Sequence, residues 1–244
     1  MERSSSLFCF LLLAASLTGG CGASGTRSTG ASVDVLDPTQ PHYGNSDDEW
    51  GALWWKWNYE LPQMAGNCRV PFEDPTGAFC ADGQSGDVFF LAGTLGGAVV
   101  RDKCVVPKGK AIFFPILSFS ADNAGLPPGM QLSDADLMAY MKTQLDGIPV
   151  SGLSADFDGV PIANLAHFRT QITKFSYTLP PEPNLYTCNG QTGVTGVVDP
   201  SYAAGFYVML APPPAGAHTL HFAGNAPASS PPFKVDVTYH FTIP

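Results

Sequence analysis

The C-terminal segment has the most regular pattern of the chain. Residues 233–243 alternate between apolar and polar side chains, and the apolar positions are Phe233, Val235, Val237, Tyr239, Phe241 and Ile243. This period of two predicts a β-strand with one face in a core and the other toward water. Short apolar runs between turn residues predict further strands at residues 87–92, 98–101, 111–116, 172–178, 206–211 and 218–222.

Two segments show a helical period instead. Ser46 and Glu49 have the spacing of a capping box, and Pro62 marks the end of the first predicted helix. Its apolar side chains fall on one stripe, which predicts a buried face: Trp50, Leu53, Trp54, Trp57 and Leu61. A second helix is predicted between Ser133 and Gly147, which suit its two caps.

These patterns predict a mainly β protein. We expect a single β-sandwich domain over residues 46–244, immunoglobulin-like or jelly-roll-like, with an N-terminal Trp-rich helix and one inserted helix. The chain has 244 residues with 26 glycines and 22 prolines, so breakers are too frequent for a helical bundle or a coiled coil. Because 45% of the residues are apolar, the chain can still build a core.

The first residues have the pattern of an export signal. Arg3 precedes an apolar run at 7–17, which is too short to span a bilayer, so residues 1–20 are predicted to be a signal peptide. Cys21 lies where a bacterial lipoprotein would be acylated, although Thr18 stands where such signals usually have leucine. We therefore expect a membrane anchor at Cys21, with plain secretion as the alternative, and a flexible tether over residues 21–45.

Cysteine usage agrees with export. Cys9 lies in the leader and Cys21 is the lipidation candidate, so four cysteines remain. An even number in an exported chain predicts two disulfides. Of the three possible pairings we favour Cys80–Cys104 with Cys68–Cys188. A zinc site is the weaker interpretation because the chain has no C-x-x-C and no histidine close to these cysteines.

The distribution of charge along the chain limits the classes of partner that the protein is expected to bind. The formal net charge is −9, and the basic residues are scattered without a cluster. Phosphate binding requires clustered positive charge, so we do not expect nucleic acid as a partner. A carbohydrate or another small molecule outside the cytoplasm remains open.

Four residues are speculative ligand-binding candidates. Trp55 and Tyr59 lie one turn apart, on the side of the predicted helix opposite Trp50, so they are either exposed or covered by a second segment. Exposed, they could stack against sugar rings. Asp122 and Asn123 follow a strand-like run and could form a polar site at a strand end, or only a loop.

Other catalytic and metal-binding patterns are weak. The chain lacks GxSxG, HExxH and P-loop motifs, and we assign no catalytic residue, no metal site and no cofactor. His221 and His240 could share a metal only across neighbouring strands, and two solvent-facing histidines are the simpler interpretation. Asp156 and Asp158 resemble the start of a calcium loop, but Asp158-Gly159 better predicts a hairpin turn.

Several segments together resemble a family of uncharacterised exported bacterial proteins. They are WWKW at 54–57, CADGQSGDVFFLAGTLGG at 80–97, CVVPKGKAIFFPI at 104–116, GFYVMLAPPPAGAHTLHFAG at 205–224 and DVTYHFTI near the end. The resemblance covers most of the chain after the leader and implies export and a β-rich domain. It implies no reaction and no catalytic residue.

The leading functional expectation is an exported, lipid-anchored or secreted envelope protein that binds a ligand or partner without catalysis. It would lie at the outer membrane or cell surface. The alternative is a carbohydrate-binding module or a glycan-active enzyme that uses exposed aromatic side chains and a pair of carboxylates.

Overall fold

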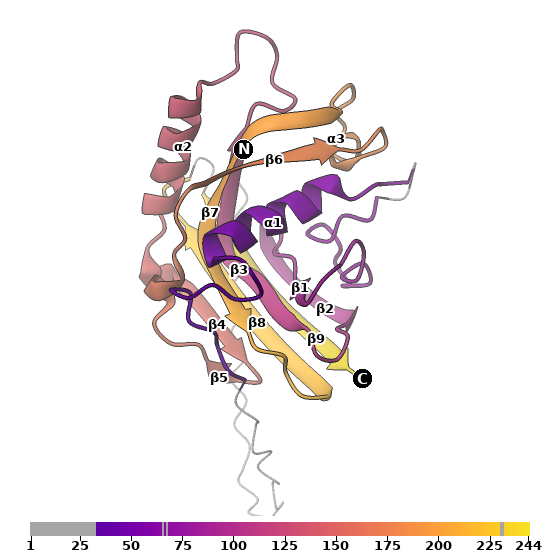
Figure 1. The fold of residues 1–244 in the computed structure, drawn as a ribbon, viewed down its shortest axis with the longest axis vertical. Helices are drawn as coiled ribbons and strands as arrows, with labels where there is room; N and C mark the ends of the chain where they lie inside the picture. The colour runs from indigo at the N-terminus through magenta and orange to yellow at the C-terminus, as the bar shows by residue number, and fades with distance from the viewer. Residues whose placement is uncertain (1–32, 65, 67, 230–231) are drawn as a thin grey trace, which may run out of the picture. The chain divides into compact units, whose positions relative to one another are not determined.

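A computed structural model describes residues 33–244 except 65, 67, 230 and 231 (Figure 1). The predicted signal peptide, Cys21 and the first part of the predicted tether lie outside the described residues. Everything below concerns the described part of the chain.

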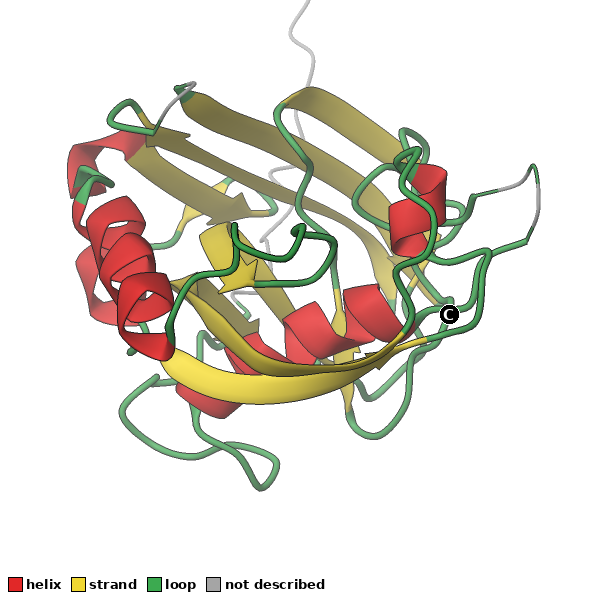
Figure 2. Cartoon of the chain, turned by 90° about the horizontal axis from the view of Figure 1, so that it is seen from above, coloured by secondary structure: helices red, strands yellow, loops and turns green. Residues whose placement is uncertain are grey.

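Nine strands form two mixed sheets in the described part, which confirms the mainly β class (Figures 1 and 2). The four-stranded sheet contains, in spatial order, β1 (Val88–Phe90), β3 (Ala111–Asp122), β7 (Gly196–Leu210) and β6 (Thr173–Leu179). The five-stranded sheet contains β2 (Gly97–Val105), β9 (Phe233–Ile243), β8 (Gly216–Ala226), β4 (Leu153–Phe157) and β5 (Val160–Pro161). The pairs β1–β3 and β2–β9 are parallel, and the other strand pairs are antiparallel.

Both predicted helices are present. The first helix, α1 (Asp47–Glu60), begins at a complete capping box in which Ser46 and Glu49 satisfy each other's backbone N–H groups. The second, α2 (Asp134–Asp146), has Ser133 as its N-cap and Gly147 as its C-cap. Three short helical turns add to them: α3 (Leu185–Cys188), η1 (Val150–Gly152) and η2 (Leu165–Phe168). Among the described residues, no helix has the length and apolar character needed to cross a membrane.

Two apolar cores lie on opposite faces of the four-stranded sheet. The inter-sheet core contains Phe114 of β3 and Phe222 of β8, whose ring centroids lie 5.1 Å apart. The helix core lies under α1, where Phe113 of β3 stacks on Tyr207 of β7 at 5.3 Å. Because neighbouring residues of a strand point to opposite faces, Phe113 and Phe114 serve different cores.

Strand β7 is much longer than the predicted segment at 206–211. Its residues from Ser201 to Leu210 are all buried, since both faces of the strand are covered. Gly205 allows the close approach of β3: a Cβ atom there would lie 2.6 Å from the carbonyl oxygen of Leu117. The clean alternation that marks a strand with one wet face is therefore missing here.

The segment before α1 is already packed, so the folded chain begins earlier than the expected start at residue 46. Val35 forms a β-bridge with Leu210, and the Leu36 N–H donates to the carbonyl of Met209 at 2.9 Å. Leu36 also contacts the helix core. The tether was predicted from the content of Gly, Ser and Thr, and such a prediction gives no weight to the few apolar residues of this segment.

Both favoured disulfides are present. Cys68–Cys188 spans 120 residues and ties the loop after α1 to α3. Cys80–Cys104 ties a neighbouring loop to β2. Disulfides of this kind are typical of proteins in oxidising compartments outside the cytoplasm.

Candidate functional site

Helix α1 fixes three loops through its predicted stripe. The indole Nε1–H groups of Trp50, Trp54 and Trp57 donate to the backbone carbonyls of His42, Leu91 and Asp82 at 2.8–2.9 Å. Trp54, Trp57 and Leu61 are buried, whereas Trp50 and Leu53 at the edge of the stripe are half-buried. The stripe is therefore structural, as its spacing predicted.

The opposite side of α1 meets a second packing surface. Tyr59 is buried: its ring stacks on Tyr177 of β6 at 4.2 Å, and its hydroxyl lies 2.6 Å from Ser120 Oγ. Trp55 stacks on the other side of Tyr59 at 5.6 Å and is only half-buried. Of the two aromatic candidates, Trp55 thus keeps more surface for a ligand.

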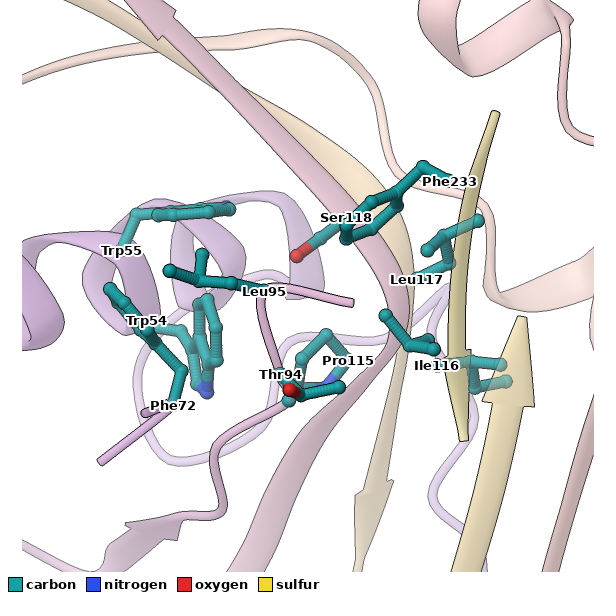
Figure 3. A pocket seen from close by; sticks show the side chains of 12 residues that line it. Trp54, Trp55, Phe72, Thr94, Leu95, Pro115, Ile116, Leu117, Ser118 and Phe233 are labelled. Carbon is teal, nitrogen blue, oxygen red and sulfur yellow. The ribbon is translucent and has the colours of Figure 1, made fainter. Parts of the chain in front are cut away.

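Three adjoining recesses lie along this side of α1, and we call them together the aromatic groove. The first is lined by Trp55, Leu95 and Ser118, among others (Figure 3). The second, of about 370 Å³, shares Trp55 and Leu95 with the first. The third, of about 410 Å³, shares Tyr59, Ser120 and Tyr186 with the second and reaches Asp122 and Tyr140.

One wall of the groove is held by a disulfide. Tyr186, Asn189 and Gln191 line the second recess from α3 and the turn after it. Cys188, within this stretch, is bonded to Cys68. The covalent link and the backbone bonds of the short helix fix these side chains against the rest of the site.

The opposite wall contains Leu95, which is 56% exposed at the junction of the first two recesses. The loop before Leu95 is fixed by Arg101, a fully buried side chain. Its guanidinium donates to the carbonyls of Ala92 and Gly93 at 2.6 and 2.8 Å, and to the hydroxyl of Tyr239 at 2.6 Å. Charge-assisted bonds of this kind hold a loop more firmly than neutral ones.

Asp122 is the last polar residue of β3 that lines the groove, and its carboxylate already accepts several hydrogen bonds. Its carboxylate accepts from the hydroxyls of Tyr177 and Ser201 at 2.9 and 3.1 Å, and from the N–H of Ala124 at 2.9 Å. Burial, and next the charge of Asp122, raises the pKa of Tyr186 to about 12. Burial also raises the pKa of Tyr59 and Tyr177, so all three hydroxyls are protonated and can donate at neutral pH.

Asn123 has a structural contact. Its side-chain amide donates to the carbonyl of Leu132 at 2.9 Å and accepts from the N–H of the same residue at 2.8 Å. This two-way bond closes the loop between β3 and α2. The loop interpretation of Asn123 therefore has the stronger support, while Asp122 lines the groove.

The other candidates lie apart from the groove. His221 contacts Asp156 and Asp236 at 3.2 and 3.1 Å, whereas His240 contacts Asp102. Asp158 is in the turn of the β4–β5 hairpin, with a φ of 51°. Among the described residues, no group of three or more potential ligands is placed to hold a metal ion.

Several lining residues were not identified from the sequence. Ser118 comes from β3, Tyr140 from α2, and both Tyr186 and Gln191 from α3 and the turn after it, so only the tertiary fold brings them together. One local signal existed: Ser118, Ser120 and Asp122 alternate along β3 and therefore share a face.

Comparison with known proteins adds no relative: no family model, no curated protein and no solved structure matches the chain. The resemblance to exported bacterial proteins therefore stays a prediction. Functional inference rests on the geometry of the site.

Proposed function

We propose that this chain is an exported envelope protein that binds a small ligand in the aromatic groove without catalysis. The observation that carries the proposal is the half-buried Trp55 beside recesses of several hundred cubic ångströms. Ligand sites are typically concave, mostly apolar and supplied with a few fixed polar groups. The groove has this character, since aromatic side chains adjoin Ser120, Asp122 and Asn189.

Export and anchoring form the second part of the proposal. The leader, the position of Cys21 and the resemblance to exported bacterial proteins support it, and so do the two disulfides. Replacement of the lipid-accepting sulfur, Cys21→Ala, should move the protein from the membrane fraction to the soluble fraction. A variant that stays with the membrane would contradict acylation at Cys21.

We also propose that the two sheets form a β-sandwich of immunoglobulin-like or jelly-roll-like type. The contact between Phe114 and Phe222 supports it, because the rings come from different sheets and meet in one core.

A glycan-active enzyme is the second candidate function. Hydrolysis of a glycosidic bond commonly uses two carboxyl groups about 5–10 Å apart across a cleft. Asp122 is the one carboxylate among the described residues that line the groove, and its oxygens accept from neighbouring protein groups. The geometry therefore favours binding over hydrolysis.

The binding proposal is tested by titrating the full chain with a library of metabolites and glycans and following its thermal unfolding. A ligand should raise the midpoint of the wild-type protein, and Trp55→Ala should reduce its affinity by about tenfold or more. Trp50→Ala is the matched control, because Trp50 lies on the other side of the same helix, outside the groove. An equal loss of affinity in both variants, or a ligand whose affinity changes in neither, would contradict a site in the aromatic groove.

A further inference from the structure

The aromatic groove is elongated. Its three recesses follow one another along β3, from Ser118 through Ser120 to Asp122. The residues of β3 that line the three recesses run from Pro115 to Asp122, about 23 Å at 3.3 Å per residue; the first recess is narrow, at about 50 Å³, and the other two provide most of the volume. A groove of this length suits a chain-like ligand better than a single ring.

Polar and aromatic groups are separated within the groove. Ser118, Ser120 and Asp122 lie at alternate positions of β3, which places their side chains in one polar row on the face toward α1. Figure 3 shows the Ser118 hydroxyl directed toward the side of the pocket where Trp55 and Leu95 lie. Aromatic side chains flank this row: Trp55 and Tyr59 from α1, Tyr186 from α3 and Tyr140 from α2.

This separation favours an amphipathic ligand. A purely apolar chain, such as a lipid tail, would exclude water from the row of hydroxyls and the carboxylate without replacing its hydrogen bonds, which is costly. A sugar ring has an apolar face of C–H groups that can lie on an aromatic side chain, and hydroxyls at its edge that can bond to such a row.

The charges of the groove favour a neutral ligand. The residues that line the three recesses include no lysine, arginine or histidine in the described part of the chain, and they include the carboxylate of Asp122. An anionic sugar or a phosphate would meet no cation here. The uncharged amides of Asn189 and Gln191 instead offer both donors and acceptors for hydroxyls.

We infer that the aromatic groove binds a neutral, linear oligosaccharide of several rings, with Trp55 and Tyr140 as aromatic contacts near its two ends. This inference rests on the proposed function, because it names the ligand class of the same site. The ring faces lie against the aromatic walls, and the hydroxyls bond to the row along β3.

The test is calorimetric titration of the full chain with neutral glucose and N-acetylglucosamine oligomers of increasing length, and with acidic oligosaccharides of matching length. Affinity for a neutral series should rise by about tenfold or more from one ring to several and then level off. Tyr140→Ala should weaken the longer oligomers several-fold. Tyr43→Ala, the control, should leave them unchanged, since Tyr43 is similarly exposed (43% against 47%) but lies outside the groove.

Trp55→Ala provides a second variant, whose fold is checked by its circular dichroism spectrum. If non-saccharide ligands bind in a Trp55-dependent way while neither neutral series does, the oligosaccharide inference fails and the binding function stands. If no library compound shows Trp55-dependent binding, both fail. Equal affinity for one ring and for several would overturn the inference that the ligand is an oligomer. Preference for the acidic series would overturn the inference that it is neutral.

Discussion

The inter-sheet core and the helix core share strands β3 and β7 but differ in composition. The inter-sheet core is rich in aliphatic side chains and contains residues of both sheets and of α2. The helix core contains all four tryptophans of α1 among its buried and packed residues, together with tyrosines such as Tyr59, Tyr177 and Tyr207. It is covered by one helix and by loops, and the aromatic groove opens beside it.

The difference shows how one sheet can serve stability on one face and, if the groove binds a ligand as proposed, recognition on the other. Aliphatic side chains interdigitate between two sheets without needing polar partners. Tyrosine and tryptophan bring hydroxyl and indole N–H groups that must be satisfied, and they leave polar edges where the covering element ends. The helix core is therefore the side on which a binding site can form with little cost to the fold.

The largest expected effect comes from a cavity in the inter-sheet core. Phe114→Ala removes a fully buried ring that packs against Phe222, and should lower the free energy of unfolding by about 3–5 kcal/mol. Urea denaturation measures the change, with the exposed Val100→Ala as a control that stays close to wild type. The protein that remains folded should keep its ligand affinity, and a loss of affinity equal to that of Trp55→Ala would mean that the two faces are coupled.

The second effect is at the start of the helix. Asp47 is buried with no hydrogen-bond partner for its carboxylate in the described structure, and burial raises its pKa to about 6 from 3.8. The folded state therefore holds a proton that the unfolded chain releases, so stability falls as the pH rises from about 4 to about 6. Asp47→Asn should remove this fall and stabilise the protein at pH 7.5 by up to about 3 kcal/mol.

Urea denaturation of wild type and Asp47→Asn between pH 4 and pH 8 measures this effect. The two curves should nearly coincide at pH 4, diverge between about pH 4 and pH 6, and differ by a constant amount above that. Asp87→Asn, at an exposed position, serves as the control. A constant difference at every pH would show that the carboxylate does not titrate as its burial implies.

The smallest effect concerns a single hydrogen bond under the helix. Tyr177→Phe keeps the ring that stacks on Tyr59 but removes the hydroxyl that donates to Asp122. Since Ser201 and Ala124 still donate to that carboxylate, the loss should be about 1 kcal/mol. Thermal unfolding compares it with Tyr140→Phe, because Tyr140 is an exposed tyrosine (47%); equal midpoints would contradict a stabilising role for the Tyr177 bond.

Much of the fold was predictable where one face of an element meets water. Strand β9 has the bounds that its alternation predicted, and both long helices begin at the predicted caps. Strand β7 was underestimated because its residues are covered on both faces, which removes the alternation. Strand β4 was not predicted at all, although the turn that follows it at Asp158 was.

The site was predictable only in part. Helical spacing placed Trp55 and Tyr59 on the side away from the main stripe, but it could not show that β6 covers Tyr59 and leaves Trp55 partly open. Tyr186 and Gln191 reach the groove through the Cys68–Cys188 link and the fold around it. Such long-range contacts leave no periodic trace in the sequence.

The bridge between Val35 and Leu210 distinguishes the two ends of the domain. It holds the beginning of the folded chain at one end of β7, whereas Ser201 and Asp122 pair about 30 Å away along the same strand. The first described residues therefore enter the fold at the end of β7 opposite the Asp122 end of the groove. The pairing of one short segment thus separates the entry of the chain into the fold from the polar end of the groove by most of the length of β7.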